Sequence, residues 1–261
     1  MRIVTLLENT TCREDLSCEH GLSLYIETGD LRILFDAGQS GAFADNAQKL
    51  GIDLSLVDIA IVSHGHYDHG GGLQRFLQIN PSAPVYLHKD AFMPHYNGAE
   101  KYIGLDMGIK ASDRLILVED TLQIAPGITL YSGSIPLNHP IDPAGLTVME
   151  NGQLQPEDFR HEQYLLVAEA GRSFCFSGCS HRGILNIAAH FRPDVLVGGF
   201  HFMKLTPETD GSRLTAAARE LLKYPTTYYT GHCTGEAAYG FMKPIMGERL
   251  NSIPTGTVLE W

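Results

Sequence analysis

The chain has 261 residues, a formal net charge of -11, 44% hydrophobic residues and 19% charged residues. This length and composition indicate a globular protein with a substantial buried core. The acidic excess has no local run of lysine or arginine to reverse it, which argues against a nucleic-acid-binding surface. No apolar run reaches transmembrane length, so no membrane partner is expected, and residues 1–7 are too short for the apolar core of a signal peptide. The 5 cysteines include no C-x-x-C pair, so we expect a cytoplasmic protein with free thiols.

Strands dominate the first thirty-odd residues of the chain, and strands alternate with helices after them. Its expected strands are short apolar or alternating runs, at residues 3–7, 22–27, 31–35, 57–62 and 85–88. Gly29-Asp30 marks a hairpin turn between the second and third of these strands. Apolar residues at helical spacing predict helices at residues 41–50 and 72–79.

Residues 89–113 have no clear period and are rich in aromatic side chains. They are expected to be either an irregular insertion or a lid over a substrate, and the sequence does not choose between the two. Residues 133–160 are rich in turn-forming residues.

Strands and helices continue in the remainder of the chain. The expected strands are at residues 115–118, 128–131, 164–168, 173–176, 195–197, 226–229 and 257–261, and the expected helices are at residues 182–191, 212–222 and 235–246. No linker divides the chain, so we expect one domain over residues 1–261. The pattern favours an α/β sandwich of sheets with helices outside.

The most informative stretch is Ser63-His64-Gly65-His66-Tyr67-Asp68-His69, which follows an apolar β-branched run. Imidazole and carboxylate groups are the nitrogen and oxygen ligands that zinc-like or iron-like ions take. A polar surface loop that happens to be rich in histidine is the alternative. It does not explain why His-x-His-x-Asp-His stands where a buried strand ends, so we interpret the loop as a metal site.

Three further apolar runs also end in small residues, a glycine and a histidine or cysteine. Their terminal residues are Ser177-Gly178-Cys179-Ser180-His181, Gly198-Gly199-Phe200-His201 and Thr230-Gly231-His232-Cys233. Asp36 ends another strand. If the carboxyl ends of these strands lie at one rim, their loops converge on a shared metal site, and the glycines allow the close backbone approach that such a site needs.

The H-x-H-x-D-H run resembles the signature of the metallo-β-lactamase superfamily, whose fold is a four-layer αββα sandwich, and the resemblance covers nearly the whole chain. It implies that His64 and His66 bind one ion and that Asp68 and His69 bind a second. His232 stands where the last histidine ligand of the family belongs. Asp36 matches an early aspartate that usually supports a ligand by hydrogen bonding.

The chain departs from the family at two ligands. Cys179 stands where an aspartate that bridges both ions is expected, and it is either a thiolate ligand or a small residue behind the ligands. His161 and His181 compete for one remaining histidine position. His201 fits a contact to substrate or a hydrogen bond to a ligand better than direct ligation.

Several motifs narrow the resemblance to the subgroup named for dihydropterin ribofuranosyl-aminobenzene phosphate synthase. They are Glu19-His20-Gly21-Leu22-Ser23, Leu34-Phe35-Asp36-Ala37-Gly38-Gln39-Ser40, Ser177-Gly178-Cys179-Ser180-His181-Arg182-Gly183-Ile184, Gly198-Gly199-Phe200-His201 and Gly231-His232-Cys233-Thr234-Gly235. Many members of that subgroup are described only as metal-dependent hydrolases.

The expected function is therefore hydrolysis of a small phosphoester, lactone or thioester by water activated at two divalent ions, zinc first and iron or manganese as alternatives. Asp68 is the candidate catalytic group, which holds or deprotonates the water. Arg182 and Lys204 are candidates to bind an anionic small-molecule substrate, or are solvated surface charges. Serine-hydrolase and nucleotide-binding motifs are absent.

Two other functions stay open from the sequence. One is a pterin-type synthase that acts on a phosphorylated substrate. The other is an iron-binding redox protein or a protein without catalysis. The sequence does not indicate the oligomeric state.

Overall fold

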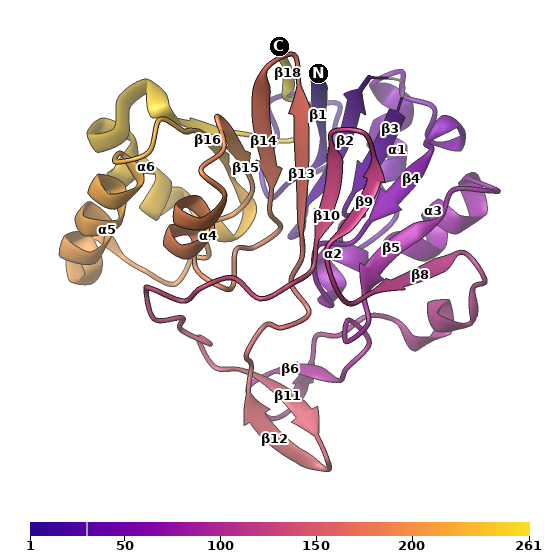
Figure 1. Ribbon diagram of the computed structural model, residues 1–261, viewed down its shortest axis with the longest axis horizontal. Helices are drawn as coiled ribbons and strands as arrows, with labels where there is room; N and C mark the ends of the chain where they lie inside the picture. Colours follow the sequence, from indigo (N-terminus) through magenta and orange to yellow (C-terminus); the bar gives the residue numbers. More distant parts are fainter. Residues whose placement is uncertain (30) are drawn as a thin grey trace. The chain divides into compact units, whose positions relative to one another are not determined.

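The computed structural model describes residues 1–29 and 31–261, which form two compact units (Figure 1). The units are interleaved along the chain. Unit 1 comprises Met1–Asp120, Pro143–Gln163 and Pro254–Trp261, and unit 2 comprises Thr121–Asp142 and Tyr164–Ile253. The single domain expected over residues 1–261 stays a prediction.

Unit 1 contains a seven-stranded sheet in the order β18-β1-β2-β3-β4-β5-β8. Its strands are β1 (Arg2–Leu7), β2 (Ser23–Thr28), β3 (Leu31–Phe35), β4 (Ile59–Ile61), β5 (Val85–His88), β8 (Leu115–Val118) and β18 (Val258–Glu260). Strands β3, β4, β5 and β8 run parallel to one another, and the other pairs are antiparallel. Thr28 pairs with Leu31, which confirms the predicted hairpin. The predicted turn at Gly29-Asp30 includes position 30, which lies outside the described residues.

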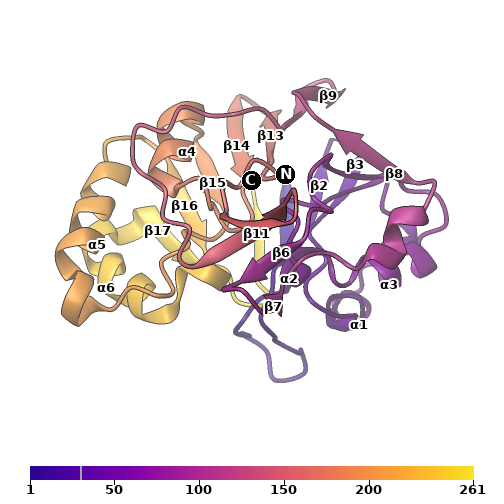
Figure 2. The same ribbon diagram turned by 90° about the horizontal axis from the view of Figure 1, so that it is seen from below.

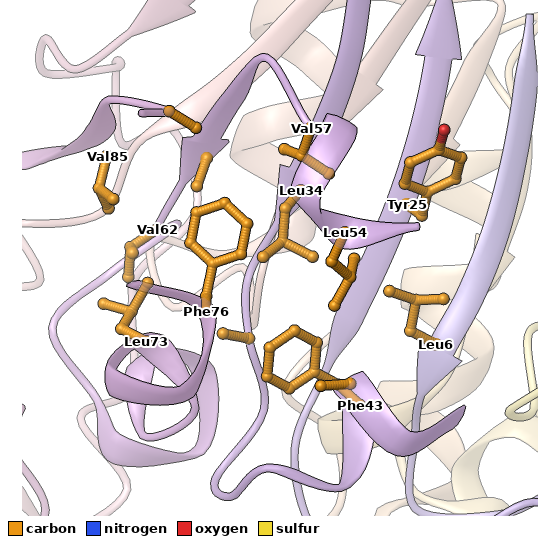
Figure 3. Close-up of a cluster of buried hydrophobic side chains, with 14 of the residues drawn as sticks. Leu6, Tyr25, Leu34, Phe43, Leu54, Val57, Val62, Leu73, Phe76 and Val85 are labelled. Atoms are coloured by element: carbon orange, nitrogen blue, oxygen red, sulfur yellow. The ribbon is translucent and has the colours of Figure 1, made fainter. Parts of the chain in front are cut away.

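Two helices pack on this sheet through buried apolar side chains, as Figure 3 shows. They are α1 (Ala42–Lys49) and α3 (Leu73–Ile79). Phe43 of α1 and Phe76 of α3 are both 0% exposed and belong to one cluster with Leu34 and Val62. Burial of each such side chain contributes about 1.5–3 kcal/mol. This core holds the ends of β3 and β4 in place, where the predicted metal-site residues begin.

Unit 1 also contains a small sheet in the order β12-β11-β6-β7. Its strands are β6 (His95–Asn97), β7 (Lys101–Tyr102), β11 (Leu146–Glu150) and β12 (Gln153–Pro156). Residues 89–113 thus hold two short strands and the 3-10 helix η2 (Met107–Ala111), and the alternative of an irregular insertion stays a prediction. Strands β6 and β11 pair across about 50 residues, which local periodicity does not reveal. The role as a lid stays a prediction.

Unit 2 contains a second seven-stranded sheet in the order β17-β16-β15-β14-β13-β10-β9. Its strands are β9 (Leu122–Ala125), β10 (Ile128–Tyr131), β13 (Tyr164–Glu169), β14 (Arg172–Phe176), β15 (Val195–Val197), β16 (Thr227–Thr230) and β17 (Leu250–Ser252). Strands β14 to β17 are parallel, and β9, β10 and β13 join antiparallel. The sequence did not predict β9 and β17, which are short and lie at the two edges of the sheet.

Three helices pack against the unit 2 sheet, and Figure 1 shows them together beside β14 to β16. They are α4 (Ile184–Phe191), α5 (Pro207–Leu221) and α6 (Glu236–Met246). Each contributes fully buried side chains, among them Ile187, Leu214 and Met242. Each unit is therefore a sheet covered by helices, which confirms the predicted α/β class. Among the described residues, no helix has the length and apolarity needed to cross a membrane.

The unit 1 core is testable by truncation of one aromatic side chain. Phe76→Ala removes a fully buried ring and is expected to lower the free energy of unfolding by about 3–5 kcal/mol. Leu56→Ala is the control, because Leu56 is 52% exposed, and it is expected to change that free energy by less than about 0.5 kcal/mol. Urea unfolding followed by circular dichroism measures both values. Equal losses in the two variants would contradict the described packing.

Candidate metal centre

The histidine-rich loop is buried, although most of its side chains are polar. His64 and His69 are 0% exposed, His66 is 3% exposed and Asp68 is 8% exposed. The segment is not loop throughout, because Tyr67–Gly70 forms one helical turn, α2. The helical turn carries Asp68 and His69, whereas His64 and His66 precede it. Polar side chains are buried at this density when they bind one another or a ligand.

Close backbone contacts hold this loop against residues 89–113. A Cβ atom at Gly65 would lie 2.2 Å from the carbonyl oxygen of Ala91, so this position requires glycine. The N–H of Tyr67 donates to the carbonyl of Ile103 at 2.8 Å. Figure 2 shows β6, β7 and α2 next to one another. The segment that was a candidate lid is thus attached directly to the metal loop.

Asp36 and Ser63 lie side by side because β3 and β4 are parallel neighbours. Asp36 is 1% exposed and has a positive φ of 60°. Its Oδ1 accepts the Ser63 N–H at 2.7 Å, and its Oδ2 accepts the Ser63 hydroxyl at 2.8 Å. The same Oδ2 lies 2.6 Å from Nδ1 of His69. One buried carboxylate therefore binds both the start of the loop and its last histidine.

These contacts determine which nitrogen of two histidines carries the hydrogen. An ionised carboxylate only accepts, so His69 donates from Nδ1 to Asp36 and keeps its lone pair on Nε2. Ser63 gives its one hydroxyl hydrogen to Asp36, so it accepts from Nδ1 of His64 at 2.9 Å. Both rings therefore present Nε2 as the metal-binding atom. This is how a carboxylate orients ligand histidines, which fits the supporting role expected of Asp36.

A second cluster in unit 1 joins His66 to three residues from other segments. His66, His95, Glu157 and His161 offer ligand atoms that lie within 4.8 Å of one another, and all four residues are buried. Nδ1 of His95 lies 2.6 Å from Oε2 of Glu157. Nδ1 of His161 accepts the N–H of Gly65 at 2.8 Å, which leaves its hydrogen on Nε2, 3.6 Å from Oε1 of Glu157. The sequence singled out His161 but missed His95 and Glu157.

Burial and mutual charge determine the protonation of this cluster. Burial lowers the pKa of His66 well below its ordinary value, and the neighbouring His161 adds to the effect. Burial also lowers the pKa of His161 to about 4, with His95 as the next cause. Burial alone would raise the pKa of Glu157, but the contacts with His161 and His95 hold it well below its usual range. At neutral pH, His66 and His161 are therefore neutral imidazoles beside the charged Glu157 carboxylate, which is the state that binds metals.

His20 is a further neighbour of the loop that the sequence did not assign a role. Its Nε2 lies 3.2 Å from Oδ2 of Asp68, and Nε2 of His69 lies 3.8 Å from the same oxygen. Gly21 permits this approach, since a Cβ atom there would lie 2.6 Å from the Asp68 carbonyl oxygen. The Glu19-His20-Gly21 motif could have indicated a role for His20, but we used it only to identify the subgroup.

In unit 2 the predicted residues gather at the carboxyl ends of three parallel strands. Strands β14, β15 and β16 are neighbours in the sheet, and Cys179, His181, His201 and His232 follow their ends. The ring centroids of His181 and His201 are 4.3 Å apart. His201 and His232 have positive φ values of 57° and 50°, each at a cost of about 1–3 kcal/mol. Strained backbone of this kind concentrates at functional sites.

Unit 2 also contains a sulfur cluster that includes one residue outside the predictions. Cys179, His201 and Cys233 offer ligand atoms within 4.8 Å of one another. Burial alone would raise the pKa of Cys233, but hydrogen bonding to Cys179 and His201 holds it well below its ordinary value. Arg182 and Lys204, the candidate substrate-binding residues, belong to the same unit. Arg182 is buried, and Lys204 is exposed.

The donor atoms fit a divalent ion of the zinc, iron or manganese type. Unit 1 supplies histidine nitrogens and carboxylate oxygens at buried positions, with His64 and His69 oriented through their Nδ1 atoms. Among the residues that the structure describes, the buried Nε2 atom of His95 has no hydrogen-bond partner. Unit 2 adds histidine nitrogens and thiols.

Residues 16–156 match the family model of the Metallo-beta-lactamase superfamily. The chain belongs to this superfamily. Its metal-dependent hydrolase fold is shared by the solved structure of Tm1679, a metal-dependent hydrolase of the beta-lactamase superfamily. The two chains are 31% identical, with a TM-score of 0.84 over 100% of this chain and 99% of the other. The fold family expected from the H-x-H-x-D-H run is confirmed.

Two relatives come from Methanocaldococcus jannaschii. One is 7,8-dihydropterin-6-methyl-4-(beta-D-ribofuranosyl)-aminobenzene-5'-phosphate synthase, 27% identical over 270 residues that cover 93% of this chain and 90% of the relative. The other is an uncharacterized protein, 29% identical over 210 residues that cover 77% of this chain and 80% of the relative. The synthase confirms the resemblance to the subgroup that bears its name.

The orienting role of Asp36 is testable by a change of one atom. The amide of Asp36→Asn replaces one accepting oxygen by a donor, so His69 and Ser63 compete for the remaining oxygen. Zinc affinity is expected to fall by about 10–100-fold, as measured by competition with a chromophoric chelator. Asp45→Asn is the control, because Asp45 is exposed on α1. A folded Asp36→Asn protein with unchanged zinc affinity would refute the orienting role.

Proposed function

We propose that this protein is a hydrolase that uses water activated by two divalent ions to cleave a small phosphoester, lactone or thioester. Zinc is the first choice of ion, with iron and manganese as alternatives. The observation that supports this most strongly is the contact of Asp36 with Ser63 and His69, which directs Nε2 of two loop histidines to ligation. Such orientation has no use in a solvated loop.

The proposal assigns the ligands in two groups. His64 and His66 bind one ion, and Asp68 and His69 bind the second. The resemblance to the family, by sequence alone, adds His232 and Cys179.

His161 receives a positioning role instead of ligation. Its Nδ1 accepts the Gly65 N–H, and its Nε2 hydrogen faces Glu157. Ligation through Nε2 would therefore require this ring to lose its last hydrogen or to break the contact with Gly65. His181 is then the remaining candidate for the histidine position that the sequence left open, and His201 keeps the proposed contact to substrate or to a ligand.

Divalent ions in such a site supply Lewis-acid activation of water and of a carbonyl or phosphoryl oxygen. The chain itself supplies Asp68, and we assign its carboxylate to hold the water or to take its proton. His20 lies 3.2 Å from that carboxylate and is placed to orient it. Arg182 and Lys204 are the proposed contacts to an anionic group of the substrate. Burial of the loop limits competing water and strengthens these electrostatic interactions.

A second candidate is a synthase that acts on a phosphorylated pterin-type substrate. The 27% identity to the Methanocaldococcus jannaschii synthase over 93% of this chain supports it. The two functions share the metal centre and differ in what the substrate site recognises. A phosphorylated dihydropterin is a ligand in the second case only, and calorimetric titration of the metal-loaded protein with such a compound separates the two.

Metal dependence is the first test of the hydrolase. We expect that dialysis against a chelator abolishes hydrolysis of bis(p-nitrophenyl) phosphate and that zinc or manganese restores it. Removal of the hydrogen-bond partner of a metal ligand lowers activity by about 10–100-fold. His66→Ala removes a proposed ligand itself, so its activity is expected to fall by more than this. His190→Ala, an exposed histidine on α4, is the control and should keep full activity.

Turnover that survives complete metal removal, or an undiminished His66→Ala protein, would contradict the proposal. A panel of phosphoesters, lactones and thioesters then identifies the substrate class. We expect one class of substrate to be hydrolysed much faster than the others, because a single metal centre with a single substrate pocket favours one leaving group.

A further inference from the structure

His95 and Glu157 form a carboxylate–histidine pair outside the histidine-rich loop. Both are buried, with exposures of 1% and 3%, and Nδ1 of His95 lies 2.6 Å from Oε2 of Glu157. The carboxylate only accepts, so His95 carries its hydrogen on Nδ1 and its lone pair on Nε2. That Nε2 atom is buried and has no hydrogen-bond partner within residues 1–29 and 31–261. A buried acceptor left in this state destabilises the fold, and a bound ligand would offset that cost.

The pair is held against the metal loop by the backbone. The N–H of Ile103 donates to the carbonyl of His95 at 2.8 Å, and the carbonyl of Ile103 accepts the N–H of Tyr67 at 2.8 Å. The N–H of Glu157 donates to the carbonyl of Leu146 at 3.1 Å, at the start of β11, which itself pairs with β6. The carboxylate, the imidazole and the loop therefore form one connected structure in unit 1.

His161 completes the positioning of Glu157. Its Nε2 hydrogen faces Oε1 of Glu157 at 3.6 Å, and its ring lies over that of His95, with centroids 4.1 Å apart and planes inclined by 33°. Its Nδ1 accepts the N–H of Gly65, within the loop. A chain of contacts thus leads from Gly65 through His161 and Glu157 to His95. Oε2 of Glu157 is used by His95, so we assign this carboxylate to positioning and not to ligation.

The rings of His66 and His95 stand as two ligands of one ion would. Their centroids are 5.4 Å apart, and their planes are inclined by 77°. Two imidazoles on one tetrahedral ion have centroids about 5 Å apart, given metal–nitrogen distances of about 2.0–2.1 Å. We propose that His95 is a ligand of the ion that His66 binds, presented by Glu157, and so adds to the metal centre a ligand that the H-x-H-x-D-H run does not contain. This inference rests on the metal centre of the proposed function.

Metal binding without turnover tests the inference. Purified protein is stripped of metal, and Zn²⁺ affinity is measured by chelator competition for the wild type, His95→Gln and Glu157→Gln. We expect the affinity of the tightest site to fall by more than about 100-fold in His95→Gln and by about 10–100-fold in Glu157→Gln. The visible spectrum of the Co²⁺-loaded protein is expected to change in His95→Gln, because a nitrogen ligand is lost.

His88→Gln is the matched control, since His88 is a histidine of unit 1 that is also buried, at 5% exposure, and lies outside the cluster. Melting temperatures of the metal-free proteins identify any variant that fails to fold. If His95→Gln does not fold, Glu157→Gln provides the test, because it keeps the side-chain volume. Folded variants with wild-type Zn²⁺ affinity and an unchanged Co²⁺ spectrum would overturn the role of His95 and leave the proposed function standing. A wild-type protein that binds no Zn²⁺ at all would overturn both.

Discussion

The contact between Asp36 and the pair Ser63 and His69 is the interaction on which the candidate metal centre depends. Asp36 has a positive φ of 60°, which costs free energy in a residue other than glycine. The backbone around it is held by hydrogen bonds from Asp36 to Ile61 at 2.8 Å and from the Ser23 hydroxyl to the Asp36 carbonyl at 2.8 Å. The first bond follows from the parallel pairing of β3 with β4, and the second from the antiparallel pairing of β2 with β3. The sheet thus determines the orientation of one carboxylate, and the carboxylate determines the tautomer of two histidines.

Glu157 repeats this arrangement at a second histidine. As Asp36 accepts a hydrogen from His69, Glu157 accepts one from His95, at the same distance of 2.6 Å. In each case a carboxylate from a distant segment leaves the far nitrogen of the ring as the metal-binding atom. Two pairs built alike around one short loop are more simply explained by ligation than by stability, because apolar side chains would fill the same volume at lower cost.

Contiguous motifs made the central part of the site predictable. Four of these residues lie within six positions at the end of an apolar run: His64, His66, Asp68 and His69. Asp36 lies at the end of another apolar run, so the positions of the strand ends were enough to identify all five residues. Most strands and helices were predicted because their apolar periods are regular. The helical turn α2 was missed, since four residues are too few to show a period.

The rest of the site depends on contacts between segments far apart in the sequence. His95 and Glu157 are 62 residues apart and meet through the pairing of β6 with β11. No local sequence pattern predicts this pairing. The proposed choice of His181 over His161 rests on which ring nitrogen accepts the Gly65 N–H, an atomic detail outside any spacing rule. Cys233 was overlooked because Cys179, its neighbour in the fold, lies 54 residues earlier.

Diffraction from crystals of the zinc-loaded protein at the zinc absorption edge tests the central claim most directly. We expect an anomalous peak about 2.0–2.1 Å from Nε2 of His64 and another at the same distance from Nε2 of His69. Crystals that contain zinc by elemental analysis but show no anomalous peak beside these two histidines would refute their role as ligands.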